Sequence, residues 1–268
     1  MRHLFRIEIV AVLLLMGVLA VPVQAEENAL NKQELRAMLR EIIKENPGLI
    51  LDVLREHSEF VLAVAQQGAD MQKEKQLLAQ WKQDISQPKS FRQDGRPSLG
   101  PADAPVTIAV FMSFTCTYCR QMEQHIKKLM SIYEGKIRLV YKLLPLPSHP
   151  NSLESAEFML AAHKQDMKKS WTLFDTLFEN GDKIVSSNGQ AFIRAAVADS
   201  GLNLKKVLNE VKSDKVRSIL HEDEEDAQKL QFQGTPSFLV NNLVIRGYIR
   251  EDLFRQAVDM ALAEAHKK

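Results

Sequence analysis

Cysteine is nearly absent from this sequence. The chain of 268 residues has two cysteines, and both lie in the stretch SFTCTYCRQ, residues 113–121. A disulfide between them would close a loop with only two intervening residues, and so short a loop removes little entropy from the unfolded chain. This scarcity argues against a scaffold held together by disulfides, and we expect the pair to be present for its reactivity.

The chain also lacks an excess of charge of either sign, with 35 Lys and Arg against 34 Asp and Glu. A nucleic-acid-binding protein would favour a clear basic excess, so we expect no nucleic-acid partner. The seven histidines show no metal-ligand spacing, and no second Cys-x-x-Cys is present. A structural zinc site needs four ligands, so we expect no such site.

Long apolar runs are absent except near the N-terminus. Arg2 and Arg6 precede an apolar run from Ile9 to Val21, and small residues lead up to Ala25. This is the layout of a secretory signal peptide, residues 1–25. The 13 apolar residues fall short of the roughly 20 that a membrane-spanning helix needs. We expect cleavage after Ala25, a periplasmic location and, since no cysteine follows the run, no lipoprotein-type anchor.

Residues 26–87 have the pattern of an all-helical segment. Three apolar stripes follow helical spacing, and the third is the weakest. Their members are Leu35, Met38, Leu39, Ile42 and Ile43, then Ile50, Val53, Leu54, Phe60, Val61 and Val64, then Met71, Leu77, Leu78 and Trp81. ENPGL, residues 45–49, breaks the first helix, because proline disfavours a helical residue before it. A helical segment of this size cannot easily bury its apolar stripes alone. We therefore expect residues 26–87 to oligomerise or to fold back onto the catalytic domain of the same chain.

The stretch SQPKSFRQDGRPSLGPADAP is dense in Pro, Gly and Asp and is typical of a linker or loop. After it, VTIAVFM (106–112) predicts a buried central strand. Residues 116–133 have helical spacing and residues 136–144 predict a second strand, which together make a parallel β-α-β unit.

The rest of the chain predicts a helical block and a closing hairpin. Residues 151–231 are helical in pattern throughout, and residues 237–248 predict a hairpin that turns at Asn241 and Asn242. A closing helix follows. The predicted fold class is α/β, a small mixed sheet flanked by helices with a large helical insertion.

Cys116 stands where the first strand ends and the helix begins, with Cys119 one turn further on. The helix dipole and the unpaired N–H groups there favour the thiolate, which is the reactive form. The second thiol lies on nearly the same helix face, where it can attack a mixed disulfide at the first. The pattern predicts a dithiol exchange centre.

A second motif supports this prediction. In FQGTPSFLV, Thr235 and Pro236 come directly before a strand. A proline can stand at the start of a strand but not inside a central one.

These motifs together resemble the DsbA family of exported thiol-disulfide oxidoreductases. The resemblance rests on GPADAPVTIAVFMSFTCTYCRQM, the helical insertion at about 151–231 and GTPSF, and it covers residues 98–265. It implies a thioredoxin fold and a redox-active disulfide in which Cys116 is the nucleophile and Cys119 the buried resolving cysteine. It also implies that Pro236 is a cis-proline facing the disulfide, and that the backbone of Thr235 pairs with the substrate. No metal or organic cofactor is implied.

The sequence departs from the family pattern at two places. Thr117 and Tyr118 stand between the cysteines, where a proline often comes first. Val110 occupies a position at which the family often has a buried acid, so proton transfer to and from Cys119 must use water or another group.

Residues 26–87 resemble the extension through which the ScsC-like and 27-kDa-outer-membrane-protein-like branches oligomerise. We expect a homo-oligomer, a dimer rather than a trimer.

The sequence therefore predicts a periplasmic protein disulfide oxidoreductase that introduces or isomerises disulfides. Its partners would be unfolded or misfolded exported proteins with thiols or disulfides, and a membrane redox partner of the DsbB or DsbD type. Three alternatives remain: a copper-handling protein that holds Cu(I) on both thiolates, a structural surface protein with a vestigial thioredoxin domain, and a simple oxidase without isomerase activity.

Four side-chain environments are also predicted. We expect Cys116 to be exposed with a lowered pKa, and Cys119 to have a raised pKa. His125, on the helix that follows the cysteines, is expected to be solvated. The acidic run HEDEED, residues 221–226, is expected to be an exposed helix face.

Overall fold

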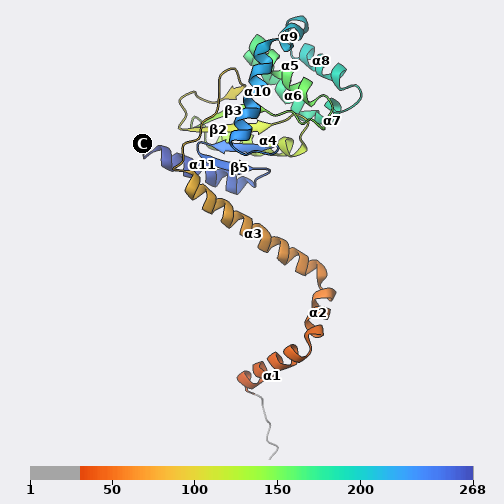
Figure 1. Ribbon diagram of the computed structural model, residues 1–268, viewed down its shortest axis with the longest axis vertical. Coiled ribbons are helices and arrows are strands. Elements are labelled where there is room, and N and C mark those ends of the chain that lie inside the picture. The colour runs from red at the N-terminus through yellow and green to blue at the C-terminus, as the bar shows by residue number, and fades with distance from the viewer. Residues whose placement is uncertain (1–30, 268) are drawn as a thin grey trace, which may run out of the picture. The chain divides into compact units, whose positions relative to one another are not determined.

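A computed structural model describes residues 31–267 of the chain (Figure 1). The predicted signal peptide, residues 1–25, lies outside the described residues. The chain divides into two compact units at Ala69 and Asp70. The helix α3, Ser58–Asp84, runs through this division.

The N-terminal unit consists of α1 (Lys32–Glu45), α2 (Pro47–Glu56) and the first part of α3. A capping box with Asn31 as the N-cap residue starts α1. Pro47 opens α2, where the missing N–H has no cost, so the break predicted at ENPGL is confirmed. A second break at His57 was not predicted, because no proline or glycine marks it and the apolar spacing continues across it. The second stripe spans this break, with its first three residues on α2 and its last three on α3, and the third stripe also lies on α3.

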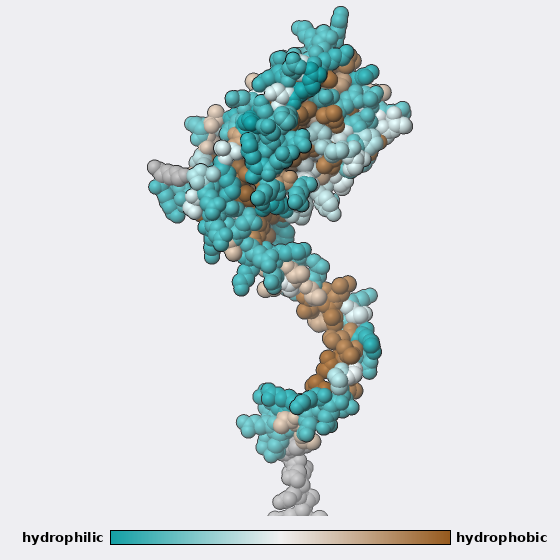
Figure 2. Space-filling model, in the orientation of Figure 1, coloured by the Kyte–Doolittle hydropathy of each residue, from teal (hydrophilic) through white to brown (hydrophobic). Residues whose placement is uncertain are grey.

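No side chain among residues 31–69 is buried. Most large apolar side chains there are 41–70% exposed, from Ile50 at the lower end to Leu62 at the upper end, and Val61 is half-buried. Figure 2 shows hydrophobic residues gathered along α2 and the start of α3. Within residues 31–267, no helix is both long enough and apolar enough to cross a membrane.

The C-terminal unit is built on one five-stranded mixed sheet of order β1-β3-β2-β4-β5. The strands are β1 (Ser98–Leu99), β2 (Val106–Met112), β3 (Ile137–Leu143), β4 (Ser237–Val240) and β5 (Leu243–Arg246). β2 and β3 are parallel, and the other neighbouring pairs are antiparallel. The short strand β1 lies in the stretch predicted to be a linker or loop. It could not be predicted, because a strand of two residues is too short to show a hydrophobic period.

Helices cover the sheet and form the predicted insertion. α4 (Thr117–Ile132) connects β2 to β3, and α11 (Glu251–Ala265) closes the chain. The insertion contains α5 (Ser152–Gln165), α6 (Met167–Glu179), α7 (Gly181–Ile184), α8 (Gly189–Asp199), α9 (Leu204–Val211) and α10 (Asp214–Lys229). In Figure 1, α5 to α9 gather together, away from α11. The predicted thioredoxin fold with a large helical insertion is confirmed.

The C-terminal end of α3 belongs to the core of this unit. Trp81 is fully buried, and its indole N–H donates to the carbonyl of Val244 at 3.0 Å. Leu77, Leu78 and Ile85 pack against the same core. The last part of the helical segment predicted at 26–87 therefore covers the outer edge of the sheet at β5.

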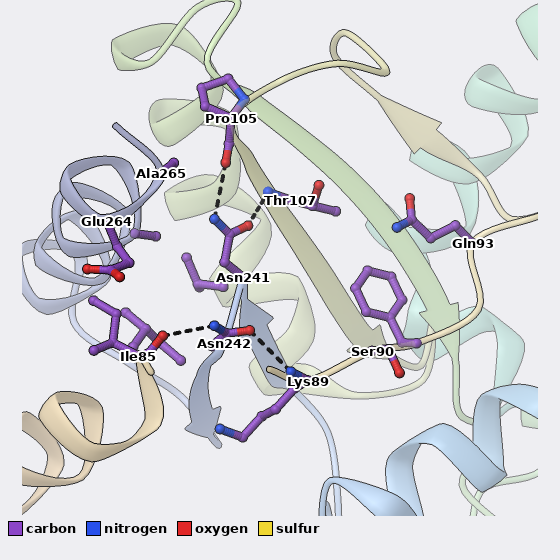
Figure 3. Close-up of a pocket in the computed structure, with 14 residues that line it drawn as sticks. Ile85, Lys89, Ser90, Gln93, Pro105, Thr107, Asn241, Asn242, Glu264 and Ala265 are labelled. Carbon is purple, nitrogen blue, oxygen red and sulfur yellow. Dashed lines mark hydrogen bonds between the residues drawn. The ribbon is translucent and has the colours of Figure 1, made fainter. Parts of the chain in front are cut away.

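The hairpin between β4 and β5 turns at Asn241, whose φ is 49°, and Asn242 (Figure 3). The Asn241 side chain accepts from the N–H of Thr107 at 2.8 Å and donates to the carbonyl of Pro105 at 3.1 Å. Asn242 donates to the carbonyl of Ile85 at 2.9 Å. The Asn241 bonds hold the start of β2, and the Asn242 bond holds the residue after α3. Both asparagines line a cavity of about 430 Å³ at the end of the sheet far from the cysteines.

The acidic run at 221–226 is not an exposed face throughout, so that prediction is wrong for two residues. Asp223 is fully buried and Asp226 is 3% exposed. The buried Lys142 ammonium lies 2.8 Å from Asp223 and 2.7 Å from Asp226, and Arg96 donates to Asp223 at 2.8 Å. The two carboxylates are three residues apart, so they share the face of α10 that packs on β3.

Candidate active site

Cys116 is the N-cap residue of α4, directly after the turn that leaves β2. Its sulfur accepts a hydrogen bond from the backbone N–H of Cys119 at 3.3 Å. Both thiols are free in this structure. A helix N-terminus stabilises negative charge through its unpaired N–H groups and its dipole, so this position favours a thiolate.

The two thiols differ in acidity. A hydrogen bond with the Cys119 side chain lowers the pKa of Cys116 to about 6, with further help from Thr235 and from the backbone N–H groups of Cys119 and Tyr118. Burial opposes this shift. Burial raises the pKa of Cys119 above its usual range, and the neighbouring Cys116 adds to that rise. At neutral pH the negative charge of the pair therefore resides on Cys116.

Cys116 is less exposed than the sequence predicts. Its exposed fraction is 6%, against 3% for Cys119. The loop that carries Thr235 lies over the sulfur, and sequence pattern alone cannot show a cover that comes from so far along the chain. The Cys116 sulfur is therefore largely covered.

The covering loop contains a cis peptide bond between Thr235 and Pro236. The Cys116 thiol donates to the carbonyl of Thr235 at 3.4 Å, which joins residues 119 positions apart. The Thr235 hydroxyl oxygen is buried without a hydrogen-bond partner among the described residues. The backbone N–H groups of Gly234 and Thr235 likewise donate to no group in residues 31–267. The structure thus brings together all four residues singled out in the sequence.

A network of hydroxyl groups supports the turn before Cys116, and sequence reasoning missed it. The hydroxyls of Ser113 and Thr115 lie 3.0 Å apart, and each lies within 3.1 Å of the Ser152 hydroxyl at the start of α5. The Nδ1 atom of His149 lies 3.1 Å from the carbonyl of Thr115. The polar stretch SFT gives a weak signal for this network, but its partners come from the helical insertion.

Aromatic rings flank the pair on its other side. Tyr118 is 60% exposed and Tyr248 is 47% exposed, with ring centroids 6.5 Å apart. The ring of His125 lies 5.5 Å from that of Tyr248, and its Nδ1 atom is buried without a partner among the described residues. His125 is therefore half-buried against an aromatic ring, which corrects the expectation of a solvated residue.

A buried carboxyl group lies near Val110, although Val110 itself carries none. In the parallel ladder Val110 pairs with Tyr141, and the Tyr141 hydroxyl donates to Glu123 at 3.4 Å. Glu123 is 9% exposed, one helical turn after Cys119, and burial raises its pKa to about 7. In the sequence Glu123 looks like a solvated residue of an amphipathic helix, and only packing on the sheet reveals its environment.

Comparison with known proteins agrees with this geometry. The model of the thioredoxin family matches residues 92–260, more than half of the chain. A probable disulfide bond formation protein D from Bacillus cereus is 26% identical over 179 residues, which covers 64% of this chain and 81% of that protein. A Na(+)/H(+) antiporter from Salinispora tropica is 28% identical over 167 residues, but the chain spans only 24% of its length.

Solved structures share the fold. Oxidised BdbD from Bacillus subtilis is 21% identical with a TM-score of 0.57, over 66% of this chain and 98% of that one. ScsC from Proteus mirabilis in a transitional conformation is 23% identical with a TM-score of 0.55, over 88% and 99%. Such identities show the fold alone, whereas the family match and the relatives named for disulfide bond formation show the class. The chain belongs to the thioredoxin family, among its DsbA-like members, and is a thiol-disulfide oxidoreductase.

Proposed function

We propose that this protein is an exported, periplasmic oxidoreductase that both introduces and isomerises disulfides, with Cys116 as the nucleophile and Cys119 as the resolving cysteine. The observation that carries this proposal is the position of the Cys116 sulfur, at the N-cap of α4 and 3.4 Å from the carbonyl that precedes a cis-proline. The pattern of residues 1–25 and the relatives named for disulfide bond formation support the compartment.

In the oxidising direction, a client thiolate attacks the Cys116 sulfur of the oxidised pair. The disulfide between the cysteines breaks, and Cys119 leaves as a thiolate that takes up a proton. A second client thiolate then attacks the client sulfur of the mixed disulfide, which forms the client disulfide and releases Cys116 as a thiolate. Because the leaving thiol with the lower pKa departs faster, the low pKa of Cys116 favours this release.

In the isomerising direction, the Cys116 thiolate attacks a wrong client disulfide, which breaks to give a mixed disulfide and a client thiolate. Another client thiolate then attacks the client sulfur of the mixed disulfide, which forms a different client disulfide and releases Cys116 as a thiolate. The free N–H of Thr235 is available to pair with the backbone of the client while this happens. A membrane partner of the DsbB type would accept electrons from the reduced pair after oxidation. A partner of the DsbD type would supply them to keep the pair reduced for isomerisation.

The exposed stripes of the N-terminal unit are the basis for a proposed homo-oligomer. Leu39, Ile42 and Ile43 are 42–49% exposed on one helix, α1. Burying such side chains is favourable by roughly 1.5–3 kcal/mol each, so association of several helices would be stabilised. Several active sites held around one client would raise its effective concentration, which suits isomerisation.

Variants of the full mature chain test the chemistry. We expect the wild type to oxidise a reduced peptide and to refold a scrambled protein with several disulfides. Cys119→Ser should accumulate a mixed disulfide with the client, visible by non-reducing electrophoresis, and Cys116→Ser should form none. Mixed disulfides in Cys116→Ser but not in Cys119→Ser would reverse the two roles. Stoichiometric Cu(I) uptake without any exchange would favour the copper-handling alternative.

A substitution in α1 tests the oligomer better than a truncation at residue 87, because truncation would remove the buried Trp81. Ile42→Asp places a charge in the apolar stripe, and Arg40→Asp is the control outside the stripe. We expect Ile42→Asp to become monomeric by sedimentation, to keep its oxidase activity and to lose most refolding of the scrambled protein. If the monomeric variant isomerises as well as the wild type, isomerisation does not depend on assembly.

A further inference from the structure

A cavity of about 1100 Å³ lies beside the site, between the helical insertion and the loop before Thr235. We call it the insertion groove. Its walls come from the segment after β3, from α5, α8, α9 and α10, and from residues 232–235. Small-molecule sites typically have volumes of roughly 300–1,000 Å³, so the groove is large enough for a chain segment.

The groove comes close to the reactive sulfur, although Cys116 itself does not line it. Thr235 and His149 both line it. The carbonyl of Thr235 is the group 3.4 Å from the Cys116 sulfur, and His149 contacts the carbonyl of Thr115 at 3.1 Å. A molecule that lies in the groove at Thr235 is therefore next to the residue whose carbonyl contacts the Cys116 sulfur.

The lining combines apolar side chains with polar ones and with charges of both signs. Leu153 on α5 is 53% exposed, and Leu146, Leu208 and Val211 are half-buried. The charged lining residues are Glu154, Glu157, Glu224, Arg194 and Lys212. Because neither sign prevails, the groove offers little selection for a charged ligand. It fits an apolar chain whose neighbouring residues carry varied charges, as in an unfolded protein.

We propose that the insertion groove holds an extended apolar segment of the unfolded client, continuous with the client cysteine that engages Cys116. The free N–H groups of Gly234 and Thr235 lie where the groove comes close to the sulfur, so they can pair with the backbone of such a segment. This inference rests on the proposed function. It adds a contact region separate from the ring pair Tyr118 and Tyr248, because neither tyrosine lines the groove.

The test compares two substrates on the full mature chain. Leu153→Asp with Leu208→Asp places two charges in the groove at positions that are not buried. The control is Met167→Asp, which replaces an apolar residue that is 67% exposed on α6 and does not line the groove.

Because the client would bury both leucines of the wild type, we expect the double variant to lose about tenfold or more in kcat/KM toward a reduced, unfolded protein. With dithiothreitol as the substrate, kcat/KM should change less than about twofold, because so small a dithiol cannot fill the groove. The control should match the wild type with both substrates.

A photo-crosslinking amino acid at position 153, combined with Cys119→Ser, gives a measurement that does not depend on charge tolerance. We expect a cross-link from position 153 to the disulfide-trapped client and none from position 167. Unchanged kcat/KM toward the unfolded protein, an equal loss with both substrates, or no cross-link at 153 would each overturn the groove as a client site. If the wild type exchanges with neither substrate, the proposed function itself fails.

Discussion

The two units of this chain carry equally regular apolar patterns and use them in opposite ways. On α1, Leu39 is 49% exposed and no residue is buried. On α4, Met122 and Leu129 are each 1% exposed. Periodicity shows that a helix has an apolar face, but the rest of the protein decides whether that face is covered. The stripe left open in the N-terminal unit is the basis of the proposed association.

The units also differ in their ionisable groups. Residues 31–69 have no buried side chain. The C-terminal unit buries Lys142, Asp223 and Glu123 as well as both cysteines. When such groups are buried, their contribution to the free energy of unfolding depends on their charge partners and on pH. The stability of the C-terminal unit should therefore respond to single charge changes and to pH far more than that of the N-terminal unit.

The largest expected effect comes from the buried ion network. Lys142→Ala leaves Asp223 and Asp226 buried without their ammonium partner. Breaking a buried pair typically destabilises by about 3–5 kcal/mol, so we expect a loss of that size in urea unfolding of the C-terminal unit. Lys127→Ala removes a surface contact to Asp175 and should change stability by less than about 1 kcal/mol. Equal effects of the two variants would contradict the distinction between the buried and exposed pairs.

The next effect concerns the thiolate and depends on pH. The pKa of Cys116 is lowered in the folded protein to about 6, against an ordinary value of 9.0. Stabilisation by this group is complete above pH 9 and is lost as pH falls through 6. The free energy of unfolding of the reduced protein, relative to Cys116→Ser, should rise by as much as about 4 kcal/mol between pH 6 and pH 9. At neutral pH, the reduced form should melt above the oxidised form.

The Thr235 side chain helps to lower the pKa of Cys116, although its hydroxyl has no partner within hydrogen-bond distance among the described residues, so Thr235→Val should raise that pKa. Alkylation rates of the reduced protein against pH would show the midpoint, near 6 in the wild type and higher in the variant. An unchanged midpoint would mean that the hydroxyl does not stabilise the thiolate.

Glu123 should give a smaller effect of opposite sign. Burial raises its pKa in the folded protein to about 7 from an ordinary 4.5. Its stabilising effect is complete below pH 4.5 and is lost as pH rises through 7, a decrease of about 3 kcal/mol. Glu123→Gln should lack this decrease in urea unfolding, and Glu134→Gln, on an exposed residue, should behave as the wild type.

The same variant addresses proton transfer to Cys119. If the Glu123 carboxyl exchanges a proton with Cys119, the rate at which Cys119 resolves the mixed disulfide should show an inflection near pH 7 when plotted against pH. Glu123→Gln should lack this inflection. Identical pH profiles in the variant and the wild type would leave water as the acceptor.

The smallest effect is expected from one leucine substitution in the N-terminal unit. Leu39→Ala should change the stability of the C-terminal unit by less than about 0.5 kcal/mol, because its side chain is outside that core. Leu129→Ala in α4 should destabilise the same unit by about 2–5 kcal/mol. Sedimentation should show weaker association for Leu39→Ala only. A large loss of C-terminal stability in Leu39→Ala would mean that the two units are packed together.

Much of the site follows from local sequence. Two cysteines at a strand-to-helix junction place a sulfur at a helix N-terminus, because a run of β-branched and apolar residues gives way there to helical spacing. The hairpin follows from Asn241, which tolerates the positive φ of its turn. Each of these features depends on a few neighbouring residues, so the pattern alone predicts it.

Tertiary structure decided the environments of the side chains. Glu123 and Asp223 look like solvated acids in the sequence, but each lies on a helix face that packs against the sheet. The approach of Thr235 to Cys116 joins residues 119 positions apart. Burial and its effect on pKa come from groups distant in the chain, which no local pattern records. The sequence by itself determined which residues can react, and only the folded chain determined which of them is charged, covered and within reach of a client.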